Sequence, residues 1–194
     1  MLAGVIWLFA YILGSLPFGV WLARTRNIDI RNHGSGNIGA TNVARTLGSK
    51  AGLLVLFADC SKGVVSVALA DRLMASETDV AIAGLLTFLG HLFSVFLKFK
   101  GGKGVATGLG VFLYLMPMPT LCAIVLFAAT LGISKYVLIS SMTAAASVPL
   151  FGFLFKLQLP YIFLSLIIAL MVIVKHMDNI QRIFEGKESR FLRK

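Results

Sequence analysis

The sequence predicts an all-α integral membrane protein, a bundle of seven transmembrane helices, and three observations lead to this fold class. Hydrophobic residues make up 58% of the 194 residues and charged residues only 13%, which is about half the charged share of an average soluble domain. Apolar runs long enough for spans recur along the whole chain. The net charge of +10 is typical of a membrane protein with basic cytoplasmic loops, and we prefer this to nucleic-acid binding.

Seven apolar runs are the predicted spans, and they cover 1–23, 51–74, 80–97, 105–116, 120–133, 136–155 and 161–174. The first lacks a basic n-region and a small-residue cleavage site, so we expect a retained helix rather than a signal peptide. The fourth and fifth are short, about 18–20 Å at 1.5 Å per residue. Pro117 and Pro119 lie between them and should interrupt any single helix.

Charge placement predicts the orientation of this bundle. With the N-terminus outside, most of the 18 Lys and Arg residues fall in cytoplasmic segments, as the positive-inside rule requires. Fusing the two short spans would instead place the basic tail outside. We therefore expect one transmembrane domain over 1–194, with a cytoplasmic C-terminus and a cytoplasm-facing site built from the loops 24–50 and 98–104 and the tail 175–194.

The first polar stretch of interest is Gly34-Ser-Gly-Asn-Ile-Gly-Ala-Thr-Asn-Val-Ala-Arg45. Glycines allow positive φ angles and a close approach of the backbone to a ligand, and successive N–H groups can line an anion-binding concavity. Arg45 adds a planar fork suited to phosphate or carboxylate. The alternative is a flexible connector between two helices.

The second stretch is Gly101-Gly-Lys-Gly104, followed by Thr107, at the start of a predicted span. A helix N-terminus with free N–H groups binds anions, and Lys103 adds a full charge. The spacing differs from a Walker A motif. The alternative is a tight turn with snorkelling lysines, and we expect the upstream His91 to be packed and hydrogen-bonded rather than catalytic.

The third stretch begins at His176, where the last span ends, and continues through Asn179. An imidazole there can act as a base or donate to a phosphate, although an interfacial histidine would have the same position. Asn179 lies on the same face if the helix continues. The spacing of Ile180, Ile183, Phe184 and Phe191 predicts a short helix on the membrane surface.

Asp59 and Lys62 are three residues apart inside the second span. Ionisable groups at this depth are costly and face a partner or a wet cavity. We expect a structural ion pair on one helix face rather than a substrate contact. Cys60 and Cys122 both lie in apolar runs, which supports neither a disulfide framework nor a metal site.

Together, the three stretches resemble the bacterial acyl-phosphate:glycerol-3-phosphate acyltransferases, the membrane enzymes that make lysophosphatidic acid. The resemblance covers essentially the whole chain and is carried by 35–45, by His91 with 101–107, and by 176–182 with Gly186 and Glu188. It implies a seven-helix protein of the bacterial cytoplasmic (inner) membrane that acts in phospholipid biosynthesis. The implied reaction transfers a fatty acyl group from acyl phosphate to the 1-hydroxyl of glycerol 3-phosphate and releases inorganic phosphate.

The resemblance also implies that no coenzyme A or acyl carrier protein is needed at this step, and we expect no cofactor, metal or nucleic acid. The expected partners are the two phosphate substrates, the lipid bilayer and the soluble enzyme that makes acyl phosphate. The expected catalytic residues are Ser35, Arg45, His176 and Asn179. The expected phosphate or substrate contacts are Gly36, Asn37, Thr41, Asn42, Gly101, Gly102, Lys103, Gly104 and Thr107. The expected structural residues are Asp59, Lys62 and Glu188.

Three alternatives stay open from the residues alone. The general base is either His176 or an oxygen of the donor's own phosphate, and either phosphate can occupy either glycine-rich stretch. A transporter or channel for an anionic metabolite would use the same basic inner face, although it should carry polar residues at the midplane of several helices. A non-catalytic scaffold for lipid headgroups is the third alternative.

Overall fold

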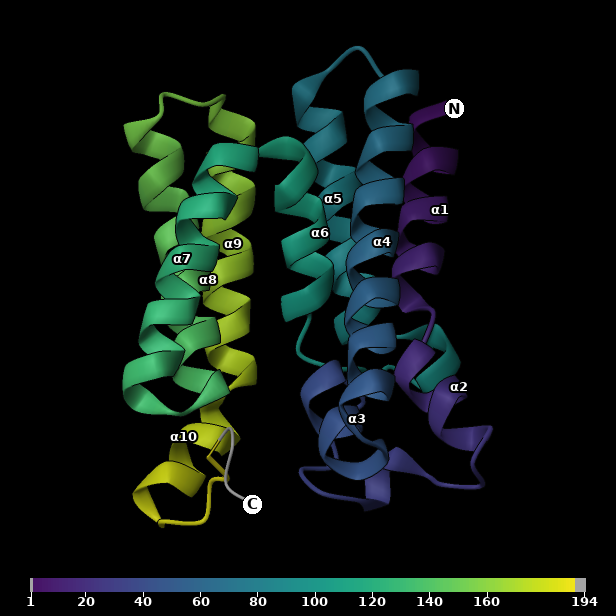
Figure 1. The fold of residues 1–194 in the computed structure, drawn as a ribbon. Helices are drawn as coiled ribbons and strands as arrows, with labels where there is room; N and C mark the ends of the chain where they lie inside the picture. Colours follow the sequence, from purple (N-terminus) through teal and green to yellow (C-terminus); the bar gives the residue numbers. More distant parts are fainter. Residues whose placement is uncertain (1, 191–194) are drawn as a thin grey trace. The chain divides into compact units, whose positions relative to one another are not determined.

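The structure, a computed structural model, describes residues 2–190, and all regular elements in that range are helical (Figure 1). The predicted all-α class is therefore confirmed. In chain order, the elements are α1 (Leu2–Ser15), α2 (Phe18–Arg24), η1 (Ile30–Asn32), α3 (Ala40–Leu47), α4 (Ser49–Leu73), α5 (Glu77–Leu92), η2 (Val95–Leu97), α6 (Val105–Leu115), α7 (Pro117–Ser134), α8 (Val137–Leu154), α9 (Leu159–Lys175) and α10 (Met177–Phe184).

The chain forms two compact units, one from Met1 to Leu115 and one from Met116 onward. In the first unit, α5 packs against α1 and α4, and α4 also contacts α3 and α6. In the second unit, α8 packs against both α7 and α9. Glycines allow the close approach of helices in the first unit: Gly110 of α6 lies against the backbone of Cys60 in α4, and Gly90 of α5 lies against Tyr11 in α1.

Within residues 2–190, five segments are long and apolar enough to cross a membrane, and they are Leu2–Arg24, Ser49–Leu73, Glu77–Leu97, Pro117–Ser134 and Val137–Leu154. The pair α9 and α10, bent by 44°, is a sixth candidate, and α6 is a shorter apolar helix. Their length and composition are those expected of an integral membrane protein. The predicted count of seven spans and the predicted orientation stay predictions.

Several predicted boundaries differ from the structure for identifiable reasons. The helix α7 begins at Pro117 rather than at residue 120, because a proline in the first turn lacks only an N–H that has no helical acceptor there. The helix α5 ends at Leu92 rather than at 97. The chain then turns back through Lys98 and Phe99, which both have positive φ.

Two short polar helices flank the spans. The predicted loop 24–50 contains the helix α3, which was not expected. The predicted tail helix is present as α10, while Phe191, which contributed to that prediction, lies outside the described residues. The helices α9 and α10 are bent relative to each other, so the last span does not continue straight into the tail. The predicted face shared by His176 and Asn179 required a continuous helix.

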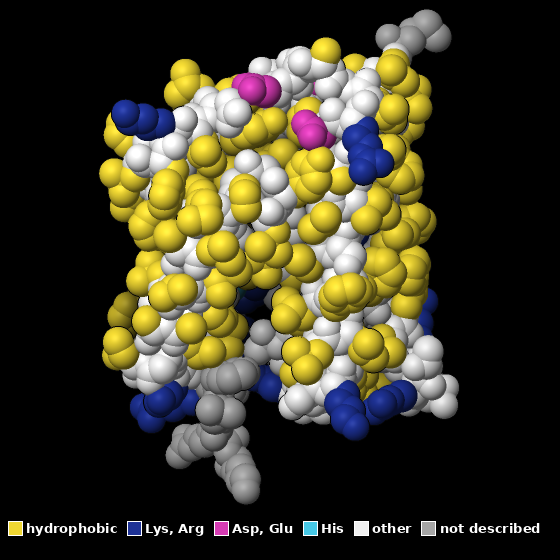
Figure 2. Space-filling model, turned by 45° about the horizontal axis from the view of Figure 1, so that its top comes forward, with side chains coloured by type: hydrophobic (Ala, Val, Ile, Leu, Met, Phe, Trp, Pro, Cys, Tyr) yellow, Lys and Arg dark blue, Asp and Glu magenta, His cyan; other side chains and the backbone are white. Residues whose placement is uncertain are grey.

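On the face shown in Figure 2, hydrophobic side chains cover much of the surface, and Lys and Arg lie mostly near its edges. Among the large exposed hydrophobic residues are Leu53, Phe57, Val125, Ile133 and Phe163. A soluble monomer rarely exposes apolar patches of this extent, and they mark a surface that contacts lipid or another apolar partner. This surface agrees with the membrane assignment from helix length.

The predicted orientation can be tested with single cysteines, because Ser49, Ser76 and Ser189 are all exposed on the protein. In intact cells, a membrane-impermeant thiol reagent should label Ser76→Cys and spare Ser49→Cys and Ser189→Cys. All three should react after the membrane is permeabilised. The parent protein measures the background from Cys60 and Cys122. Labelling of the Ser49 and Ser189 variants in intact cells would contradict a cytoplasmic location of these segments.

Candidate active site

The buried side chain of Asn42 organises the first glycine-rich stretch. It lies in α3 with 2% of its surface exposed. Its Nδ2 donates to the carbonyl oxygens of Asn37 at 2.8 Å and His33 at 2.9 Å, with Ile30 O at 3.3 Å, and its Oδ1 accepts from the backbone N–H of Ser35 at 2.9 Å. One amide thereby satisfies several backbone groups of the loop and fixes the position of Ser35.

Glycines make this arrangement sterically possible. Gly34 has φ +58° and Gly36 has φ +71°, a region that glycine adopts at little cost. A Cβ at Gly34 would also overlap with Oδ1 of Asn42. The glycines therefore serve the turn itself and the hydrogen bonds of Asn42, in addition to any contact with a ligand.

Apolar residues of the same loop pack it against α2 and α4 of the first unit. Ile30, Ile38 and Val43 are buried in one cluster with Val20 and Ala23 of α2 and with residues of α4. Full burial of one such side chain contributes about 1.5–3 kcal/mol. The polar residues between these anchors are consequently held in place rather than carried by a flexible connector.

The predicted site residues of this stretch differ in accessibility. Ser35 and Thr41 are partly exposed and Arg45 is exposed, so their side chains lie where a ligand can reach them. Asn37 accepts a hydrogen bond from the N–H of Gly39 at 3.0 Å, just before α3 begins. Together with the contacts of Asn42, this bond supports roles for both asparagines in shaping the loop, whereas their predicted contact with substrate stays a prediction.

Sequence reasoning missed an ion pair in the same loop. Arg31 donates through Nε and Nη2 to the two carboxylate oxygens of Asp29, at 2.9 and 2.7 Å. These hydrogen bonds lower the pKa of Asp29 to about 2, from 3.8. A lowered pKa means that the ion pair is present above pH 4 and is lost as the pH falls through about 2. The contact thus persists throughout the physiological range.

The glycine-rich loop 101–104 is attached to the end of α5. The N–H of Gly101 donates to Leu92 O and the N–H of Gly102 donates to His91 O, both at 3.0 Å. A Cβ at Gly102 would overlap with the ring of His91 and crowd Ile38. Because Ile38 belongs to the first stretch, Gly102 is the point at which the two glycine-rich stretches meet.

These bonds restrict which N–H groups can hold an anion. The amides of Gly101 and Gly102 already have backbone acceptors, whereas α6 begins at Val105 and the first N–H groups of a helix have no acceptor within it. An anion at this loop would therefore contact the N–H groups at the start of α6. Thr107 is completely buried and its hydroxyl has no partner in the described part of the chain, so its predicted substrate contact receives no support.

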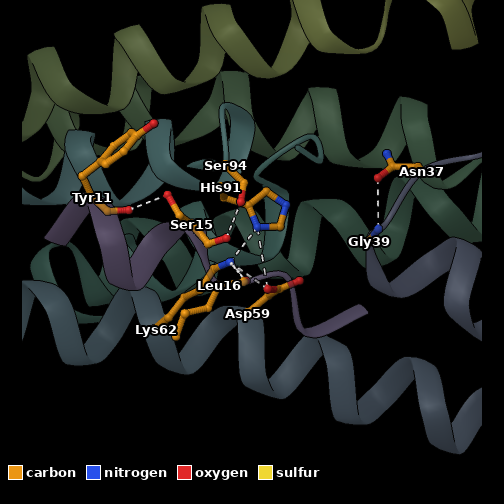
Figure 3. Close-up of polar contacts among 9 residues, drawn as sticks. All are labelled: Tyr11, Ser15, Leu16, Asn37, Gly39, Asp59, Lys62, His91 and Ser94. Carbon is orange, nitrogen blue, oxygen red and sulfur yellow. Dashed lines mark hydrogen bonds and ion pairs between the residues drawn. The ribbon is translucent and has the colours of Figure 1, made fainter. Parts of the chain in front are cut away.

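The predicted ion pair between Asp59 and Lys62 is present, and His91 joins it (Figure 3). Lys62 Nζ lies 2.9 Å from Asp59 Oδ1 and 2.8 Å from His91 Nδ1. All three side chains are at most 5% exposed. His91 is packed and hydrogen-bonded, as expected, but its partner lies 29 positions away on another helix, and spacing along one helix does not reveal such a pair.

The second unit carries the third polar stretch. His176 is buried at the junction of α9 and α10, and its Nδ1 lies 2.7 Å from Val172 O. Since a carbonyl oxygen only accepts, Nδ1 carries a proton, and in the neutral form of the ring the lone pair is on Nε2. This is the tautomer that a general base at Nε2 requires.

Glu188 connects the tail to α10. Its Oε2 accepts from Asn179 Nδ2 at 3.0 Å and from Arg182 Nε at 2.9 Å. Asn179 is 5% exposed, so this contact fixes the orientation of a buried amide. The arrangement supports the structural role predicted for Glu188.

Comparison with known proteins places the chain in a family. Residues 4–186 match the family described as Glycerol-3-phosphate acyltransferase. The chain belongs to this family. Relatives named glycerol-3-phosphate acyltransferase are 50% identical over 182 residues in Geobacter sulfurreducens, covering 94% of each chain, and 40% identical over 185 residues in Aquifex aeolicus, covering 95% of this chain and 96% of the relative. The resemblance inferred from the three motifs is thereby confirmed.

Two solved structures of PlsY (YgiH), an integral membrane glycerol 3-phosphate acyltransferase, have the same fold. The glycerol 3-phosphate form is 39% identical with a TM-score of 0.94, covering 98% of this chain and 96% of that chain. The lysophosphatidic acid form is 38% identical with a TM-score of 0.91, covering 98% and 95%. The chain itself is therefore an integral membrane acyltransferase of phospholipid synthesis.

Asn42→Ala should both destabilise the protein and slow the reaction. Each buried polar group that loses its partner costs about 1–3 kcal/mol, and Ser35 loses the bond that positions it. We expect a lower apparent Tm in detergent and a turnover reduced by roughly tenfold or more, since 1.4 kcal/mol corresponds to tenfold. Asn42→Asp keeps the acceptor for Ser35 but turns a buried carboxylate oxygen toward the carbonyl oxygens of His33 and Asn37, so it should be at least as damaging as Asn42→Ala.

Asn32→Ala is the matched control, because Asn32 is an exposed residue of the same loop. It should leave Tm and turnover near the parent values. An Asn42→Ala protein with unchanged Tm but impaired substrate binding would show that Asn42 contacts the substrate instead of holding the loop.

Proposed function

We propose that this acyltransferase moves a fatty acyl group from an acyl phosphate to the 1-hydroxyl of glycerol 3-phosphate, forming lysophosphatidic acid and inorganic phosphate. The observation that carries the proposal is the meeting of two glycine-rich stretches at Gly102 and Ile38. Arg45 and Lys103 add positive charge to these stretches. Family membership and the solved glycerol 3-phosphate and lysophosphatidic acid forms of a relative support the choice of acceptor and product.

The reaction balances with these two substrates alone. The hydroxyl oxygen of glycerol 3-phosphate attacks the acyl carbonyl carbon and forms the ester bond. The bond between that carbon and the phosphate oxygen breaks, and phosphate leaves with the electron pair. The hydroxyl proton passes to a base and finally to phosphate. Because a mixed anhydride is already activated, the protein mainly has to position the reactants and stabilise developing charge.

The proposed catalytic residues are Ser35, Arg45, His176 and Asn179. The partly exposed hydroxyl of Ser35, held through Asn42, can donate a hydrogen bond to a substrate oxygen. Arg45 and Lys103 would neutralise phosphate charge, Arg45 as a bidentate donor. The neutral form of His176 would have its lone pair on Nε2, which supports it as the general base, with an oxygen of the donor phosphate as the alternative.

The proposed setting is the bacterial inner membrane. Seven spans with the N-terminus outside would place the loops 24–50 and 98–104 and the tail from 175 on the cytoplasmic side, as one transmembrane domain. The distribution of Lys and Arg along the chain supports this orientation. A soluble enzyme that makes acyl phosphate would then deliver the donor from the same side.

The direct test measures phosphate release and lysophosphatidic acid formation by purified protein in detergent or lipid mesophase. Acyl phosphate with glycerol 3-phosphate should support both products, and an acyl-coenzyme A donor should support neither. Ser35→Ala and His176→Ala should each reduce turnover strongly while the protein stays monodisperse. Near-normal rates in both variants would leave these residues with structural roles only, and an inactive parent protein would overturn the proposed reaction.

Lys103→Ala should lower kcat/KM by roughly 10- to 150-fold, because a charge-assisted hydrogen bond contributes about 1.5–3 kcal/mol and 1.4 kcal/mol is tenfold. Lys103→Arg should retain part of the activity, since the charge survives with a different geometry. Lys100→Ala, which removes an exposed lysine from the same segment, is the control and should stay fully active. Full kcat/KM in Lys103→Ala would mean that the phosphate is held elsewhere.

Gly102→Ala should impair the enzyme through the loop rather than through charge. A Cβ at this position overlaps with the imidazole of His91 and crowds Ile38. Either the loop or the imidazole must then move. We expect a reduced affinity for a phosphate substrate, measured as a raised KM, whereas a KM equal to that of the parent would show that the contact has no influence on binding.

A further inference from the structure

The buried ammonium group of Lys62 contacts acceptors from three separate segments. It lies 2.9 Å from Asp59 Oδ1 on its own helix α4, 3.1 Å from Leu16 O and 2.8 Å from His91 Nδ1 of α5 (Figure 3). Leu16 lies in the break between α1 and α2. An ammonium group has N–H donors and no acceptor; two of its donors bond to Leu16 O and His91 Nδ1, and the carboxylate of Asp59 lies beside it as an ion pair.

This geometry determines which nitrogen of His91 carries the proton. Facing an ammonium group at 2.8 Å, Nδ1 must accept, because Lys62 can only donate. The other candidate partner of Nδ1, Asp59 Oδ1, lies 3.6 Å away, too far for a hydrogen bond. His91 is therefore neutral, with its proton on Nε2.

The protonated side of the ring lies against the glycine-rich loop. A Cβ at Gly102 would overlap with Nε2 of His91, and the N–H of Gly102 donates to the backbone oxygen of the same histidine at 3.0 Å. His91 thus contacts one glycine of the loop with both its ring and its backbone. Any rotation of this ring would displace Gly102 or leave a gap beneath it.

We propose that Asp59 and Lys62 are positioning residues that fix the ring and the Nε2–H tautomer of His91, and that His91 in turn fixes the loop 101–104 for phosphate binding. None of the three needs to touch the substrate. The part of the inference that concerns phosphate binding rests on the proposed function, whereas the tautomer and the orientation of the ring do not.

The discriminating variant replaces both charges by apolar residues of similar size, Asp59→Leu with Lys62→Met. Replacing a buried ion pair in this way is often neutral or stabilising, so the protein should fold with an apparent Tm no lower than that of the parent. His91 nevertheless loses its donor. We expect the KM of one of the two phosphate substrates to rise roughly tenfold, the scale of one hydrogen bond, while kcat falls less than about threefold.

The matched control removes a buried polar pair from the same two helices without touching the loop. Ser66 of α4 and Thr87 of α5 are hydrogen-bonded through their hydroxyl groups, and Ser66→Ala with Thr87→Val deletes that bond. This control can lower Tm, but both KM values should stay at the parent level. An equal rise of KM in the control would show that packing between α4 and α5, rather than His91, sets the loop.

Nitrogen-15 NMR of histidine-labelled protein tests the tautomer without any enzymatic activity, with His91→Gln to assign the signal. The parent should show a neutral ring protonated on Nε2, and the Asp59→Leu/Lys62→Met variant should show a mixture of tautomers. An Nδ1–H ring in the parent, or an unchanged spectrum with unchanged KM values in the variant, would overturn the proposal. An Nε2–H ring in a protein that does not acylate glycerol 3-phosphate would overturn only the proposed function.

Discussion

In the first unit, α4, α5 and the break between α1 and α2 meet at one buried interaction, the contact of the Lys62 ammonium group with Asp59, His91 and Leu16 O. A charge within the apolar part of a membrane is expensive, and it persists only where other groups replace the water it loses. Here the acceptors come from α4, from α5 and from the break between α1 and α2. The cost of burying the charge therefore favours only arrangements in which these segments meet at one point.

The glycine-rich loops are built outward from such fixed points. Backbone groups that leave a helix must find new partners, and His91 O and Leu92 O find them in Gly102 and Gly101. The side-chain amide of Asn42 likewise donates hydrogen bonds to the carbonyl groups of His33 and Asn37. Both loops thus obtain a defined shape from a few buried groups, although they contain little regular structure.

Much of the fold was predictable because lipid imposes a simple requirement, long apolar helices that satisfy their own backbone. The short helix α3 was not predictable, since its polar sequence gives no apolar run, and Pro117 was taken for a breaker although it begins α7. For the site, the motifs led to the family that the comparisons confirm, while the roles of the individual residues stay predictions. Motif spacing did not reveal that Lys62 and His91 are partners, because contacts between helices leave no regular spacing in one sequence.

The glycines of the loop 101–104 illustrate why a motif alone does not define a mechanism. A glycine-rich segment before a helix suggests free N–H groups for an anion, yet the N–H groups of Gly101 and Gly102 are bonded to α5. What these two residues contribute is the absence of a side chain, which lets the loop lie directly on the backbone and ring of His91. The start of α6 is the part of this segment that we propose to meet the phosphate. Glycine is required both in a loop that binds an anion and in a loop that lies on His91. Only the hydrogen-bonding partner of each amide distinguishes the residues that bind a ligand from those that hold the loop in place.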